Sequence, residues 1–265
     1  MRERVIGIDF SADAKNAGRQ TRIATAMLGG NRTRIDACFP VPGAPARADA
    51  HAALARFIAD QSDAVIGIDF PFALPAPVMD VAHWPEFVLG FGAAHADPDA
   101  FRAACLRRAG GKELKREIDV TARAPYSGYN IRMKTMAFHA IRDVLAPLIE
   151  HDHARALPFQ RPASDKPIMV EICPASTLNR LGLYRKHRGY KSADPAPRRR
   201  ILAEIIDCGL VAPLPKAIER DVIEDRGGDA LDAVIAAGAV AEAVRSGALA
   251  EPVSDRERLE GRIYY

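Results

Sequence analysis

One short segment occurs twice in the chain, and this repeat constrains the fold more than any other feature. Residues 5–10 read Val-Ile-Gly-Ile-Asp-Phe, and residues 65–70 repeat them identically. Each copy is apolar and rich in β-branched residues until it reaches the acid, which is typical of a strand buried on both faces of a helix-covered sheet. Two such strands should occupy similar environments and place Asp9 and Asp69 at equivalent points.

The segments between the two copies predict how these strands are connected. Residues 21–28 and 33–39 have strand character and are separated by Gly29-Gly30-Asn31, which predicts a hairpin. Apolar residues at helical spacing predict a helix over residues 48–61. A right-handed crossover through this helix returns the second copy parallel to the first. Asp9 and Asp69 should then be neighbours at the carboxyl edge of the sheet, where α/β folds gather their sites.

The rest of the chain predicts a single domain over residues 1–265 with a helical insertion over 76–133. Residues 134–150 should form a helix that ends or kinks at Pro147. The remaining predicted elements are a buried strand over 167–173, helices over 175–183, 198–208 and 229–245, and a short edge strand in the tail 260–265. In the helix over 229–245, the spacing of Leu231, Val234, Ile235 and Gly238 predicts the face that packs on the sheet.

Charge is distributed unevenly along a chain whose composition is otherwise that of an ordinary globular protein. The net charge of the 265 residues is +3, but residues 102–134 carry +6 and residues 180–200 carry +7, which leaves −10 for the remainder. Two basic blocks in an acidic chain favour one face that holds a polyanion, although charge runs are also typical of solvated surface.

Four isolated cysteines exclude a zinc ribbon and a CxxC redox motif, and they indicate a reducing compartment. No segment has the apolar length of a signal core or a membrane span. We therefore expect a cytoplasmic protein without a membrane partner.

Five acids lie on apolar elements and are the candidate site residues: Asp9, Asp69, Glu171, Asp229 and Asp232. Asp229 and Asp232 are three residues apart in the first turn of a predicted helix, so they face the same way, near the positive end of the helix dipole. Clustered carboxylates repel one another, and a divalent cation relieves the repulsion. Oxygen ligands without histidine or thiolate favour Mg²⁺ or Mn²⁺.

Each acid also has a structural interpretation. Asp9 or Asp69 could cap a turn at a strand end, and Asp229 could cap its helix. Glu171 could pair with a buried arginine or lysine. The set is more informative than its members, because separate elements supply acids to one predicted edge.

The basic blocks contain candidate substrate-binding residues. Arg188 and Lys191 could bind a phosphate, and Lys191 could also reach the acids or be solvated. Four tyrosines in the blocks could stack on bases or cover the core: Tyr126, Tyr129, Tyr184 and Tyr190. Among the histidines, His139 is expected to pack or to lie at the surface.

The order of these elements resembles the RNase H-like fold, with a strand ending in Gly-Ile-Asp, a hairpin, a helix, a second strand ending in Asp and a late Asp-x-x-Asp helix. The motifs are similar to those of the domain-of-unknown-function family numbered 429, described as predicted RNase H-like nucleases. They are Gly7-Ile8-Asp9, Gly67 to Pro71, Val170 to Ala175, Asp229 to Ala233 and Glu260 to Ile263. The resemblance implies that Asp9, Asp69, Asp229 and Asp232 match the acids of Holliday-junction resolvase-type nucleases, and that Glu171 lies in a family motif.

The sequence therefore predicts a metal-dependent nuclease that hydrolyses phosphodiester bonds of DNA or RNA. Two alternatives stay open. One is a non-catalytic binding protein that retains the fold. The other is a phosphotransferase of the sugar-kinase and actin type, which would require a second such domain and glycine-rich phosphate loops. The oligomeric state is left open.

Overall fold

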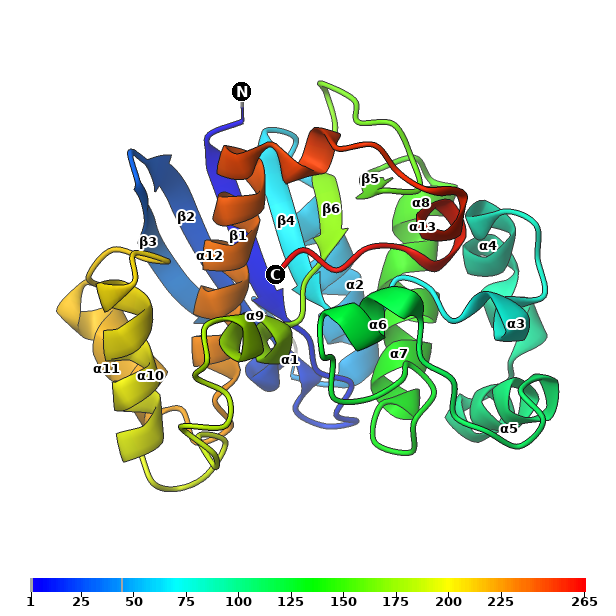
Figure 1. The fold of residues 1–265 in the computed structure, drawn as a ribbon, viewed down its shortest axis with the longest axis horizontal. Coiled ribbons are helices and arrows are strands. Elements are labelled where there is room, and N and C mark those ends of the chain that lie inside the picture. Colours follow the sequence, from blue (N-terminus) through cyan, green and yellow to red (C-terminus); the bar gives the residue numbers. More distant parts are fainter. Residues whose placement is uncertain (1, 44) are drawn as a thin grey trace.

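A mixed β-sheet forms the centre of the molecule (Figure 1). The computed structural model describes residues 2–43 and 45–265, and in this part of the chain six strands pair in the order β3-β2-β1-β4-β6-β5. The strands are β1 (Arg4–Asp9), β2 (Arg22–Gly29), β3 (Arg32–Pro40), β4 (Ala64–Asp69), β5 (Arg155–Leu157) and β6 (Ile168–Glu171).

The strand directions confirm the predicted α/β class, in which a hairpin and parallel strands share one sheet. Strand β1 pairs antiparallel with β2 of the hairpin and parallel with β4. The β1–β4 register joins the two sequence copies residue for residue, from Val5 opposite Val65 to Asp9 opposite Asp69. Helix α2 (Arg47–Ala59) makes the crossover that the sequence predicted.

Side-chain alternation along these strands divides the core into two layers. Ile6 and Ile8, with their counterparts in β4, pack into a cluster with α2 and the helices of the insertion. Val5 and Val65 face the opposite side and pack with α12 (Asp229–Ser246). Figure 1 shows α12 lying across one face of the sheet and α2 behind the other.

Glycines let α12 approach the sheet closely. A Cβ atom on Gly7 would lie 2.2 Å from the carbonyl oxygen of Ala233, and one on Gly67 would lie 2.2 Å from Val240 Cγ2. The prediction that Leu231, Val234, Ile235 and Gly238 form the face packed on the sheet is wrong in part. A Cβ atom on Gly238 would meet Leu210 rather than a strand. The reason is that α12 is buried on nearly all sides, so its large apolar residues do not identify the side next to the sheet.

Residues 76–133 form helices joined by loops, as predicted, and lie beside the β5 edge of the sheet (Figure 1). Their helices are α3 (Ala76–Met79), α4 (Trp84–Ala94), α5 (Pro98–Arg108) and α6 (Glu117–Thr121). The following helix consists of α7 (Lys134–Ala140), a π-helical turn η1 (Ile141–Leu145) and α8 (Ala146–Glu150). The π turn ends at Leu145, two residues before Pro147, which has no N–H to continue the regular ladder.

The C-terminal part differs from the prediction in its tail and in two helices that the sequence did not predict, over residues 216–224 and 255–260. Helix α13 (Asp255–Glu260) ends at Glu260, and Ile263 makes an isolated bridge to Glu171 rather than an edge strand. The remaining helices are α1 (Ala17–Gln20), α9 (Pro174–Arg180), α10 (Ala196–Asp207), α11 (Lys216–Glu224) and the 3-10 turn η2 (Ala248–Ala250). No helix in the described residues is both long enough and apolar enough to span a bilayer.

Candidate functional site

Three aspartates from three elements meet at the carboxyl edge of the sheet. Asp9 ends β1, Asp69 ends β4, and Asp232 lies in the first turn of α12. Each offers a carboxylate oxygen within 4.8 Å of the others, which confirms the predicted proximity of Asp9 and Asp69. Strand alternation explains the convergence, because Asp9 points to the same side as Gly7, toward α12.

The first turn of α12 is built so that Asp232 reaches the strands. Gly228 has φ of 77°, a left-handed conformation suited to glycine, and begins the helix. Asp225 accepts a hydrogen bond from Ala230 N at 2.7 Å and thereby caps the helix. Asp229 lines the same cavity but lies outside the group of three closest carboxylates in the described chain.

Lys191 and Tyr190 contact the cluster from the second basic block. Lys191 Nζ lies 2.6 Å from Asp232 Oδ2, and Tyr190 donates its hydroxyl to Asp232 Oδ1 at 3.0 Å. Lys191 thus reaches the acids, as one of the two alternatives predicted, while its side chain stays 48% exposed. Gly228 leaves room for both residues, because a Cβ atom at this position would lie 3.1 Å from Lys191 Cγ and 3.1 Å from Tyr190 Cδ2.

Burial and mutual repulsion dominate the electrostatics of the carboxylates. Burial raises the pKa of Asp9 well above its usual range; Lys191 lowers it, while Asp232 and Asp69 raise it further. Burial, with Asp232, raises the pKa of Asp69 to about 7, and burial also raises that of Asp229 to about 6. Burial alone would lower the pKa of Lys191, but the charges of Asp232 and Asp9 raise it.

The donor set fits a divalent cation. It consists of hard carboxylate oxygens, and Asp9 and Asp232 are 6% and 1% exposed. One lysine supplies a single positive charge against three carboxylates, so the ionised cluster is left with uncompensated negative charge in a buried place. Mg²⁺ or Mn²⁺ held by Asp9, Asp69 and Asp232 would balance it.

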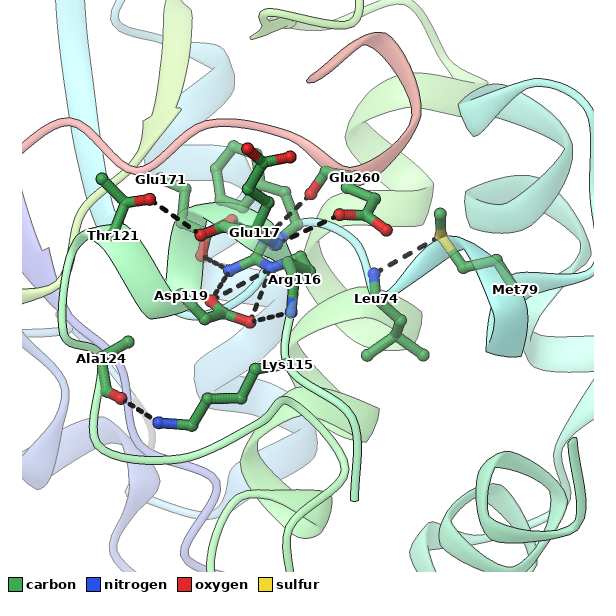
Figure 2. Close-up of polar contacts among 11 residues, drawn as sticks. Leu74, Met79, Lys115, Arg116, Glu117, Asp119, Thr121, Ala124, Glu171 and Glu260 are labelled. Carbon is green, nitrogen blue, oxygen red and sulfur yellow. Dashed lines mark hydrogen bonds and ion pairs between the residues drawn. The ribbon is translucent and has the colours of Figure 1, made fainter. Parts of the chain in front are cut away.

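Glu171 has a different role from the predicted metal ligand. Figure 2 shows its carboxylate facing the guanidinium of Arg116. Its two oxygens lie 2.5 and 2.7 Å from Arg116 nitrogens, and Phe72 N donates to it at 3.0 Å. Arg116 also pairs with Asp119 at 2.7 Å and donates to the carbonyl of Glu260 at 3.1 Å. Glu171 is thus engaged in an ion pair, because the insertion brings a buried arginine to β6.

A cavity of about 700 Å³ opens above the acid cluster. We call the part of its lining formed by Asp9, Asp69, Asp229 and Asp232 the acidic floor. Its walls are largely apolar and include Phe10, Phe70, Met133, Met136 and Ile172. The insertion, the segment after α9 and the strand ends all contribute to it, so the site is assembled from distant parts of the chain.

Both basic blocks contribute residues to this cavity or to an adjoining one. Tyr126 comes from the first block, and Tyr184 and Arg188 come from the second. A neighbouring cavity of about 620 Å³ shares Tyr184 and Arg188 and adds Arg123 and Arg185.

Two of the tyrosines do not have the predicted stacking role. Tyr129 is fully buried and bonded through its hydroxyl to Lys112 O, while Tyr190 is 7% exposed and bonded to Asp232. A tyrosine in a basic segment can lie in the core or at the surface, and the local sequence pattern does not distinguish the two. Tyr129 and Tyr190 were therefore among the stacking candidates. Tyr126 and Tyr184 remain as the lining tyrosines.

A second polar cluster lies behind the loop that follows β1. His139 Nδ1 and His51 Nδ1 lie 2.7 and 3.3 Å from Asp143 Oδ2, and His51 Nε2 lies 3.0 Å from Ser11 O. Arg142 also contacts Asp143, with Nε 2.6 Å from Oδ1. Asp143 therefore already has cationic or hydrogen-bonding partners around it, and His139 is buried and bonded to Asp143 rather than lying at the surface.

Comparison with protein-family models, with curated proteins and with solved structures gives no match.

Sequence reasoning missed Arg116, Asp225 and the contact between Tyr190 and Asp232. Arg116 and Tyr190 lie inside the basic blocks, where nothing in the local pattern separates a buried residue from its solvated neighbours. For Asp225, the following glycines Gly227 and Gly228 were an available signal, since a tight turn before a helix is where a capping carboxylate is expected.

Proposed function

We propose that this protein is a metal-dependent nuclease of the RNase H-like type, as the resemblance to family 429 implies. The observation that carries the proposal is the convergence of Asp9, Asp69 and Asp232, with oxygens within 4.8 Å, on the floor of a cavity lined by both basic blocks. Buried carboxylates that repel one another are costly in a fold unless they serve a cation.

The residues around the cavity have different roles in this proposal. Asp9, Asp69 and Asp232 would hold Mg²⁺ or Mn²⁺, with Asp229 beside them. The bound metal would activate water and stabilise the charge that develops on the phosphodiester. Tyr190 fixes the orientation of Asp232 through its hydroxyl. Lys191 compensates part of the cluster's charge, and Arg188 lines the cavity where a substrate phosphate would enter.

Thermal melting with and without Mn²⁺ tests the proposed metal site. Mn²⁺ should raise the melting midpoint of the wild-type protein and leave Asp9→Asn, Asp69→Asn and Asp232→Asn nearly unchanged, because each variant lacks one ligand charge. Asp63→Asn is the matched control, since this carboxylate is 71% exposed and lies outside the cluster. An equal rise in every variant would remove these acids from the metal site.

Cleavage of labelled oligonucleotides tests the activity itself. The wild-type protein should cleave in Mn²⁺ and not in EDTA, and the three cluster variants should be inactive while remaining folded. Metal binding without cleavage of any DNA or RNA substrate would favour the alternative of a non-catalytic binding protein. ATP binding measured by calorimetry would favour the phosphotransferase alternative.

A further inference from the structure

The burial of the acid cluster restricts what can reach it. Asp9 and Asp232 are almost completely enclosed, so a phosphate can contact them only from inside the cavity. A duplex presents its phosphates on a broad convex surface, which a cavity of about 700 Å³ cannot enclose. Cavities of roughly 300–1,000 Å³ enclose ligands of small-molecule size, which is the scale of one nucleotide.

The walls of the cavity suit a nucleobase better than they suit a phosphate. Pro125, Met133 and Met136 are apolar lining residues that are partly or fully exposed. A flat aromatic base can be buried against such walls, whereas a phosphate would lose its water there without finding charged partners. Among the lining residues, a phosphate finds cationic partners at Lys191, beside the acids, and at Arg188, because Arg116 is buried in its own ion pairs.

Tyr126 and Tyr184 provide ring faces from the two basic blocks. Tyr126 is 36% exposed, and its hydroxyl accepts a hydrogen bond from Arg132 Nη1 at 3.0 Å, which restrains the ring. Both residues line the cavity.

The adjoining cavity continues the site with positive charge. Arg123, Arg185 and Arg188 line it, and its described lining residues include no carboxylate. It shares Tyr184 and Arg188 with the first cavity, so a strand leaving the acidic floor would meet arginines. This is the arrangement of aromatic platforms and a basic groove that suits single strands.

We propose that the substrate is single-stranded nucleic acid, from which one unpaired nucleotide enters the cavity while the neighbouring phosphates lie on Arg123, Arg185 and Arg188. This inference rests on the proposed nuclease function and narrows its substrate class. A paired nucleotide would first have to be extruded from its stack, at a cost in free energy that a single strand does not pay.

The experiment compares a labelled single strand with a blunt-ended duplex of the same sequence, as DNA and as RNA, in Mn²⁺. The single strand should be cleaved at least about tenfold faster, because one unstacked base is available without extrusion. Anisotropy with the Asp69→Asn variant measures binding separately from cleavage.

Two tyrosine variants connect the preference to the cavity. Tyr184→Ala should weaken binding of the single strand by about tenfold, whereas Tyr184→Phe, which keeps the ring, should bind like the wild type. Tyr126→Ala gives a second test at an exposed position, where folding is not at risk. Arg220→Ala is the control, since this side chain is 65% exposed and lies on α11 outside both cavities.

The outcomes separate this inference from the proposed function. Equal cleavage of duplex and single strand would overturn the inference and leave the nuclease function standing. Ring-dependent binding of the single strand without cleavage would overturn the nuclease function and support the single-strand site. Failure to bind single strands, or binding that is indifferent to both tyrosines, would overturn the inference.

Discussion

Arg116 connects three parts of the chain through one buried guanidinium. It faces Glu171 of β6 and Asp119 of α6, and it donates to the Glu260 carbonyl at the end of α13 (Figure 2). Burial alone would lower the pKa of Arg116, but the charges of Glu171 and Asp119 raise it above its usual value. The charged form is thus strongly favoured in the folded protein, and the insertion that forms one wall of the cavity is attached to the sheet by this pair.

Replacing Arg116 should therefore be severe. Arg116→Met leaves two buried carboxylates without their cation and should lower the free energy of unfolding by about 3–5 kcal/mol. Urea denaturation measures the loss, and the double variant Arg116→Met/Glu171→Met should recover part of it. Arg102→Met, which breaks a partly exposed pair with Glu113, should change stability by only about 0–1 kcal/mol. Similar losses in the two single variants would contradict the assigned role of Arg116.

The acid cluster should give the metal-free protein an unusual pH dependence. Asp69 has a pKa of about 7 and Asp229 one of about 6 in the folded protein, both above the 3.8 of an ordinary aspartate. Between pH 3.8 and about 7 the folded state retains protons that the unfolded chain has released, so the contribution of these two acids to the free energy of unfolding is greatest below pH 3.8 and falls as the pH rises to about 7. Denaturation in EDTA at several pH values should show this fall. Asp69→Asn should flatten it, and an unchanged slope would contradict the assignment to Asp69.

At the scale of elements, the two identical strands meet different surroundings at their glycines. A Cβ on Gly7 would collide with backbone atoms of α12, 2.2 Å from both Ala233 O and Ala237 N. A Cβ on Gly67 would collide with side chains, 2.2 Å from Val240 Cγ2 and 2.4 Å from Ile172 Cγ1. Substitution by alanine should therefore have different consequences at Gly7 in β1 and at Gly67 in β4.

Gly7→Ala should destabilise the protein by more than about 3 kcal/mol, because a helix backbone cannot move aside without disturbing the whole layer. Gly67→Ala should cost less, and adding Val240→Ala should restore part of the loss by removing the clashing methyl group. Ala233→Gly is the corresponding addition to Gly7→Ala and should give no rescue. Chemical denaturation measures the free energy of unfolding of the two single and two double variants. Equal rescue at both sites would contradict the assignment of the Gly7 clash to backbone atoms and of the Gly67 clash to side chains.

The elements also show where sequence reasoning succeeds and where it stops. Repeated apolar strands, a turn and a helix of standard spacing were sufficient to predict the β1–β4 pairing and the meeting of Asp9 with Asp69. Local periodicity reports burial, but it does not report which distant residue a buried acid will meet. Glu171 was therefore placed among the metal ligands, since its partner Arg116 lies 55 residues earlier in the insertion. Strand β5, with three residues, is too short to produce a pattern.

At the scale of the whole molecule, the basic blocks should make nucleic-acid binding sensitive to salt. Single-strand binding should weaken with salt with a logarithmic slope of about −0.7 for each phosphate neutralised. Replacing Arg123, Arg185 and Arg188 together by alanine should reduce the magnitude of the slope by about 2. Fluorescence anisotropy over a salt series measures it, with Arg220→Ala as the control. A slope that the triple variant leaves unchanged would place the bound strand elsewhere.

The identity of β1 and β4 has a consequence for how the chain folds. Both strands run antiparallel to β2, so β2 can pair with either copy and bury the same side chains. A misfolded intermediate in which residues 64–69 pair with β2 in place of residues 4–9 would therefore differ from the native pairing mainly in the length of the loop between the two paired strands. Loop-closure entropy discriminates weakly, at about 0.6 kcal/mol for each doubling of loop length. Strand β1 needs the shorter loop to reach β2, and its Gly7 is the position where a missing Cβ admits the backbone of α12, so both features favour the native pairing.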